Sequence, residues 1–210
     1  MSLDQRRERE KQDRRDRILD AAEQIFFTRG FEKSSMDEIA RTAQLSRALL
    51  YVYSRDKAAI MRGLVLRAGE ALRDRFADAI GQSARGAEQI GLIGMAYYHF
   101  SVEMPDYFDV LTQASTFEHL ADEDEQSASL QACATQVMSM MVAALKNGVA
   151  DGSLSRERVA DPLMTAFYLR GALHGVIMQG SKSAENDPDR PELEALVSYT
   201  MKMLMQSMRP

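Results

Sequence analysis

Residues 31–60 read FEKSSMDEIARTAQLSRALLYVYSRDKAAI and contain two short helical patterns that meet at a tight turn. Ser35 and Glu38 have the spacing of a capping box, whose side chains satisfy free amides at a helix start, so the first helix is expected to begin at Met36. Ser46 is a second N-cap candidate, and the residues after it form one apolar side and one polar and aromatic side. This arrangement predicts a helix-turn-helix, an element that places its second helix in a DNA groove.

The segment resembles the DNA-binding element of the TetR family of regulators, whose pattern is roughly T-T-x-x-x-I-A-x-x-A-G-V-S-x-G-T-L-Y-x-Y-F-x-S-K-x-x-L. The stretch before it, RDRILDAAEQIFFTRGFE, is similar to the family's first helix, with Gly30 as its C-terminal stop. The likeness extends over residues 14–60. The residues that match the pattern are Ser34, Ser35, Ile39, Ala40, Ala43, Ser46, Leu50, Tyr51, Tyr53, Lys57 and Ile60.

The resemblance implies which side chains meet DNA. Arg47, Ala48 and Val52 are expected to approach base edges, where sequence is distinguished, while other residues of the element mainly contact phosphates. The complete set of expected DNA-contacting residues is Ser35, Ser46, Arg47, Ala48, Tyr51, Val52, Tyr53 and Lys57.

Four positions depart from the family pattern. Gln44 occupies the place of the turn glycine, where a left-handed backbone would cost roughly 1–2 kcal/mol. Ala48 replaces a common glycine, and Leu49 replaces a threonine whose hydroxyl often bonds DNA in the family. Ser54 replaces an aromatic that packs under the second helix. These departures keep an alternative open, namely a helical small-molecule binding protein with a vestigial DNA-binding element.

Composition favours a cytoplasmic regulator. The chain of 210 residues is 45% apolar, and its single cysteine, Cys133, excludes an intrachain disulfide. No apolar segment follows the basic start as a signal peptide requires, and apolar runs such as residues 137–145 are shorter than a membrane span. We therefore expect a cytoplasmic protein with no membrane partner.

Charge is unevenly distributed along the chain. Residues up to Lys57 hold 13 Lys and Arg against 11 Asp and Glu, and the remainder holds 13 against 20. This small positive excess means that attraction to DNA depends on where the cations lie. The opening DQRREREKQDRRDR has helical spacing of opposite charges and either forms a solvated arm or also touches the DNA backbone or minor groove.

Apolar periodicity predicts helices throughout, so the fold class is all-α with about nine helices. We expect two domains: residues 1–56, the N-terminal arm and helix-turn-helix, and residues 57–210, a helical ligand-binding and dimerisation domain. Beyond the first three helices, the expected ones are 57–81, 87–103, 105–118, 124–150, 160–181 and 191–208.

Residues 160–208 are the expected homodimer interface. Gly171, Ala172 and Gly175 allow close backbone approach, and 191–208 carries a broad apolar face, so that two helices from each subunit could form a four-helix interface. Reading paired half-sites on palindromic operator DNA requires such two-fold symmetry. The alternative is that both faces pack on their own subunit.

Fourteen methionines suggest a cavity for a small, apolar or amphipathic effector, although apolar residues at helical spacing are equally consistent with an ordinary core. The effector would release the protein from DNA, which makes the expected function that of a ligand-responsive repressor. The candidate ligand-binding residues are Met95, Tyr98, Phe108, Leu111, Met138, Met141, Phe167, Arg170 and His174.

No catalytic or metal chemistry is expected. The chain has no nucleophile elbow, phosphate loop or dinucleotide-binding turn, and no cofactor is therefore predicted. His99, His119 and His174 lack the paired spacing of a zinc site, and Cys133 has no CxxC partner.

Overall fold

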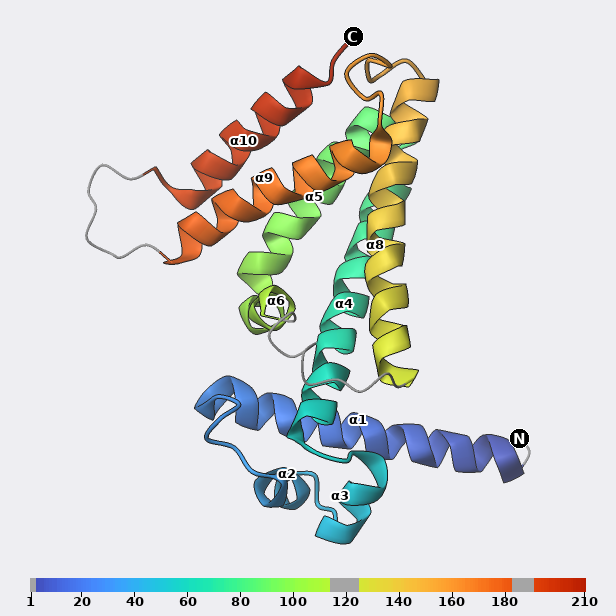
Figure 1. Cartoon of the computed structure of the whole chain (residues 1–210), viewed down its shortest axis with the longest axis vertical. Helices are drawn as coiled ribbons and strands as arrows, with labels where there is room; N and C mark the ends of the chain where they lie inside the picture. The colour runs from blue at the N-terminus through green and yellow to red at the C-terminus, as the bar shows by residue number, and fades with distance from the viewer. Residues whose placement is uncertain (1–2, 114–124, 183–190) are drawn as a thin grey trace. The chain divides into compact units, whose positions relative to one another are not determined.

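A computed structural model of the chain describes residues 3–113, 125–182 and 191–210, and within these ranges it contains helices and no strands (Figure 1). The all-α prediction is therefore confirmed. The helices are α1 (Leu3–Arg29), α2 (Met36–Thr42), α3 (Arg47–Tyr53), α4 (Lys57–Gly81), α5 (Gly86–Glu103), α6 (Pro105–Thr112), α8 (Glu125–Ala150), α9 (Pro162–Lys182) and α10 (Leu193–Ser207).

The helix boundaries follow the sequence prediction closely. The charged opening segment is helical from Leu3 and continues into α1, while α6 is described only to Thr112, short of the expected end at 118. Residues 114–124, which include His119, lie outside the described residues.

The chain divides into two compact units. The first comprises Met1–Gly69 and Asp106–Gln131, and the second comprises Glu70–Pro105 and Ala132–Pro210. The first unit therefore extends beyond the expected domain boundary at residue 57 and includes α6.

The first unit has a core to which α1, α2, α3 and α4 all contribute. Ile18, Ala22 and Phe26 of α1 pack with Ile39 of α2 and Leu50 of α3, and all five are buried. These five residues recur at helical spacing and therefore lie on one apolar face of each helix. Burial of that face in the core fixes the rotation of each helix about its own axis. Helices α2 and α3, of seven residues each, are too short to be stable alone and depend on this packing.

The second unit is built around α5, α9 and α10, which pack on one another (Figure 1). The start of α5 is held by Asp151, whose carboxylate accepts a hydrogen bond of 2.7 Å from the Gly86 amide. Gly86 also lies so close to α8 that a side chain there would meet the backbone of Gly148.

Within α8, Ser127–Ala150 is long and apolar enough to cross a membrane by length and composition alone. Core helices of soluble proteins pass the same test, so this is weak evidence for a membrane span. The expectation of no membrane partner stays a prediction.

Candidate nucleic-acid interface and ligand cavity

The start of α2 carries the predicted capping box. The Ser35 hydroxyl accepts a hydrogen bond from the Glu38 amide at 3.3 Å, and the Glu38 carboxylate accepts from the Ser35 amide at 3.0 Å. The bond from the Ser35 hydroxyl is the main cause that lowers the pKa of Glu38. Ser35 is thus engaged within its own helix start, and its expected DNA contact remains a prediction.

The turn between α2 and α3 has the predicted left-handed residue. Gln44 has φ +56°, as the glycine of the family pattern would, and is the one non-glycine residue with positive φ among those described. Arg17 of α1 donates a hydrogen bond of 2.6 Å to the Ala43 carbonyl in this turn. The bond ties the turn to α1, and Ser46 then caps α3 by accepting from the Leu49 amide at 3.2 Å.

One side of α3 is open to solvent. Leu50 is fully buried below, whereas Arg47 and Ala48 are exposed, Tyr51 is 44% exposed and Val52 is 76% exposed. Arg47 forms an ion pair of 3.2 Å with Asp37 of α2. An exposed ion pair of this kind contributes little to stability, so the guanidinium can exchange its partner for DNA at small cost.

Tyr53 and Lys57 have partners within the protein. The Tyr53 hydroxyl accepts a hydrogen bond of 3.3 Å from Arg14. The Lys57 ammonium donates to the carbonyls of Phe31 and Ser34 at 2.8 Å each and lies 4.6 Å from the centre of the Phe31 ring. Lys57 therefore anchors the start of α4 to the segment after α1, a role that sequence reasoning missed, and its contact with phosphate remains a prediction.

A charged network joins α1, α4 and α6. Arg67 of α4 forms ion pairs with Asp20 at 2.7 Å and Glu23 at 2.9 Å, and the Tyr107 hydroxyl donates to the same Glu23 carboxylate. Burial, followed by the bond to Glu23, raises the pKa of Tyr107 to about 12. Burial lowers the pKa of Arg67, but the bonds to Glu23 and Asp20 outweigh it, so the network holds the three helices together by charge.

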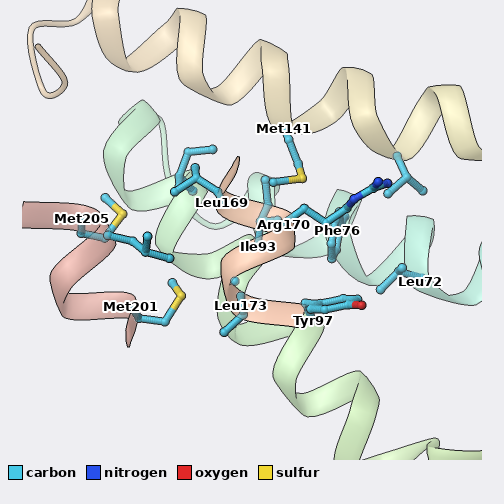
Figure 2. A pocket seen from close by; sticks show the side chains of 14 residues that line it. Leu72, Phe76, Ile93, Tyr97, Met141, Leu169, Arg170, Leu173, Met201 and Met205 are labelled. Atoms are coloured by element: carbon cyan, nitrogen blue, oxygen red, sulfur yellow. The ribbon is translucent and has the colours of Figure 1, made fainter. Parts of the chain in front are cut away.

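The second unit contains an apolar cavity of about 60 Å³ (Figure 2). Its walls come from α4, α5, α8, α9 and α10. The lining residues are Leu72, Phe76, Ile90, Ile93, Gly94, Tyr97, Val137, Met141, Leu169, Arg170, Leu173, Met201, Leu204 and Met205.

Polar groups are confined to one part of the cavity. The Tyr97 hydroxyl lies 2.8 Å from His174 Nδ1, and burial raises the pKa of Tyr97 to about 12 even though the nearby charge of Arg170 lowers it. The Arg170 guanidinium carbon is 5.1 Å from the centre of the Phe167 ring. The lining of the cavity is thus almost entirely apolar, and Arg170, an exposed residue, borders it from the solvent side.

The expected ligand-binding residues divide into three groups. Met141 and Arg170 line the cavity, while His174 and Phe167 contact residues that line it. Met95, Tyr98 and Met138 lie on lining helices but outside the lining set, and Phe108 and Leu111 belong to the first unit. Met201 and Met205 of α10 also line the cavity but were not predicted. Helical periodicity identifies the apolar face of α10 but not the helices or the cavity that this face contacts.

The remaining candidates have structural surroundings. Cys133 is buried, and burial raises the pKa of its thiol, as expected for a packed small hydrophobe. Within the described parts of the chain, no three His, Cys, Asp or Glu side chains come together as a metal site would require.

Residues 18–64, which run from within α1 through α2 and α3 into α4, match the family of bacterial regulatory proteins described as the tetR family. This segment of the chain is similar to that family. No curated protein sequence matches the chain.

Solved structures of transcriptional regulators share the fold over nearly the whole chain. A TetR/AcrR regulator from Thermobifida fusca YX-ER1 is 20% identical with a TM-score of 0.71, covering 94% of this chain and 100% of its own. The regulator FadR from Bacillus subtilis, solved with stearoyl-CoA, is 19% identical with a TM-score of 0.65, covering 92% and 98%. The ketosteroid regulator KstR2 from Mycobacterium tuberculosis is 18% identical with a TM-score of 0.65, covering 94% and 95%.

Proposed function

We propose that this TetR-family protein is a dimeric transcriptional repressor that binds palindromic operator DNA and leaves it when an apolar or amphipathic small molecule occupies the cavity. The observation that carries the proposal is the open side of α3. Val52, an apolar residue, is 76% exposed on a helix whose other side is buried in the core. Together with Arg47 and Ala48 it forms a short reading surface, in which Val52 suits a thymine methyl and Arg47 a guanine edge.

Dimerisation is supported by apolar side chains that the second unit leaves uncovered. On α9, Met164 and Tyr168 are 67% and 60% exposed, and Tyr199 of α10 is 62% exposed. Side chains added at Gly171 or Gly175 would meet nothing within 4 Å. Single exposed apolar residues are common on protein surfaces, but several of them on two helices that pack together are typical of an interface, here between two copies of the chain.

DNA binding is tested by selecting sites from random duplexes and measuring affinity by fluorescence anisotropy at several salt concentrations. The wild type is expected to show salt-dependent, sequence-selective binding to a palindrome. Arg47→Ala should change sequence preference, at about 1–3 kcal/mol for a bidentate contact, whereas Lys57→Ala should weaken all sequences alike. Arg156→Ala, exposed in the second unit, is the matched control.

The alternative of a vestigial DNA-binding element predicts no selected site and equal anisotropy for all variants. Unchanged footprints and affinities for both Arg47→Ala and Lys57→Ala would also contradict the contact assignment.

Effector release is tested by titrating small apolar carboxylates, alcohols and steroids into the protein–operator complex. FadR and KstR2 support this range of compounds, since the first was solved with stearoyl-CoA and the second is a ketosteroid regulator. A ligand that weakens operator binding must bind the DNA-bound protein more weakly by the same factor. Ligands that stabilise the protein yet leave operator affinity unchanged would refute the coupling.

A further inference from the structure

The cavity of the second unit contains a single charged residue. Arg170 is the one charged side chain among its fourteen lining residues, and Tyr97 is the one other side chain with a hydrogen-bonding group. In the described part of the chain, no Asp or Glu forms an ion pair with Arg170, and its guanidinium lies over the Phe167 ring. Arg170 is exposed, so its charge lies on the solvent side of an apolar cavity, where it favours an anionic group on the molecule that enters.

The position of Arg170 on α9 places it with the other polar groups. His174 follows it by one helical turn, so both side chains lie on the side of α9 that also presents Leu173 to the cavity. His174 in turn contacts the Tyr97 hydroxyl of α5 at 2.8 Å. Figure 2 shows Arg170 and Tyr97 entering the cavity region from different helices.

We propose that the cavity selects an apolar molecule that carries a carboxylate, with the carboxylate held by Arg170 and the Tyr97 hydroxyl and the apolar body among the methionines. This inference rests on the proposed function and specifies the chemical class of its effector. A neutral apolar molecule would gain nothing from the Arg170 charge, and a cation would be repelled by it. Charge therefore decides among ligands of equal apolar area.

The apolar body needs more space than the cavity contains at rest. Typical sites for small molecules enclose roughly 300–1,000 Å³. Met201 occupies the groove over Gly94, where an added Cβ would lie 2.6 Å from its sulfur atom. Methionine side chains are unbranched and flexible, so displacement of Met201 and Met205 lengthens the cavity without moving backbone.

This displacement has a consequence for α10. Met201 faces the cavity, while Tyr199 and Met203, two residues to either side, are exposed on the opposite face. A ligand that pushes on Met201 therefore acts on the helix that carries part of the proposed dimer surface.

The test compares three probes with the same chain and different head groups, decanoate, decanol and decylammonium, by isothermal titration calorimetry on the full-length protein at neutral pH. Decanoate should bind at least about tenfold more tightly than decanol, because a charge-assisted hydrogen bond adds that much or more. Decylammonium should bind most weakly. Arg170→Met should remove the preference for decanoate and leave decanol affinity unchanged, while the matched control Arg156→Met should behave as wild type.

Tyr97→Phe gives an independent check that does not depend on removing the charge, and should weaken decanoate a few-fold with little effect on decanol. Equal binding of decanoate and decanol to the wild type, equal loss of both in Arg170→Met, or no binding of decanoate would each overturn the inference.

Operator release separates this inference from the proposed function. If decanol releases the operator as well as decanoate does, the repressor stands and the carboxylate preference is wrong. If decanoate binds through Arg170 and the operator stays bound, the site stands and the proposed regulation fails.

Discussion

Replacement of Gly86 by alanine should be strongly destabilising, because α5 and α8 touch there through their backbones. An added Cβ would lie 2.5 Å from the Ala144 carbonyl oxygen and closer still to the backbone nitrogen and Cα of Gly148. Real Cβ atoms essentially never approach below 3.0 Å, and none of these atoms belongs to a side chain that can rotate away. The Ala144 oxygen alone requires the two helices to separate by about 0.5 Å, the difference between 3.0 and 2.5 Å, and the closer Gly148 atoms require more.

The expected cost is at the upper end for overpacked contacts, about 3 kcal/mol. Separation also weakens the hydrogen bond of 2.7 Å from the Gly86 amide to Asp151, which adds about 1 kcal/mol or more. Gly91 lies on the same helix with nothing within 4 Å of its position, so Gly91→Ala should instead stabilise the protein by roughly 0.5–1 kcal/mol.

Urea unfolding followed by far-ultraviolet circular dichroism, at one protein concentration for all variants, measures both effects. The pair should shift the midpoint in opposite directions. The reasoning is refuted if Gly86→Ala unfolds within about 0.5 kcal/mol of the wild type while Gly91→Ala behaves as expected.

Four further substitutions test other parts of the molecule. Ser35→Ala removes the capping box and should lower the free energy of unfolding by about 1 kcal/mol. A melting temperature equal to that of the wild type would contradict this. The pKa of Glu38 is lowered in the folded protein, so its ionised carboxylate stabilises the fold above the unfolded pKa, and this stabilisation is lost as pH falls through the folded pKa. Glu38→Gln should therefore reduce the loss of unfolding free energy in acid. An unaltered dependence of that free energy on pH would contradict this. Gln44→Gly relieves a left-handed residue and should raise the free energy of unfolding by about 1 kcal/mol in urea titrations, so a decrease would show that the side chain matters more than the backbone. Gly175→Glu places a charge on the proposed dimer surface and should give monomers in light scattering, while an intact dimer with a wild-type melting temperature would exclude this surface.

Local patterns accounted for most of the first unit. The capping box at Ser35, the N-cap at Ser46 and the left-handed turn at Gln44 involve residues only a few positions apart, so their geometry follows from short stretches of sequence. The buried positions of α1, α2 and α3 follow from helical periodicity for the same reason. The structure confirms these features at the predicted residues.

Contacts between distant segments were decided by the tertiary structure. Lys57 looks like an exposed cation in sequence, yet the fold brings its ammonium to the carbonyls of Phe31 and Ser34. Likewise, nothing in the spacing of Arg67, Glu23 and Tyr107 shows that they meet.

The sequence by itself determined the all-helical fold class, the residues of the helix-turn-helix and the faces of the helices that avoid water. Only the tertiary structure decided which of those faces enclose the cavity, because periodicity identifies an apolar face without identifying the helix that covers it. Phe108 and Met201 both lie on such faces, but Phe108 belongs to the first unit and Met201 closes the cavity over Gly94. The role proposed for Arg170 depends on the same information, since an exposed arginine on α9 becomes a candidate anion site only when the fold places it beside an apolar cavity.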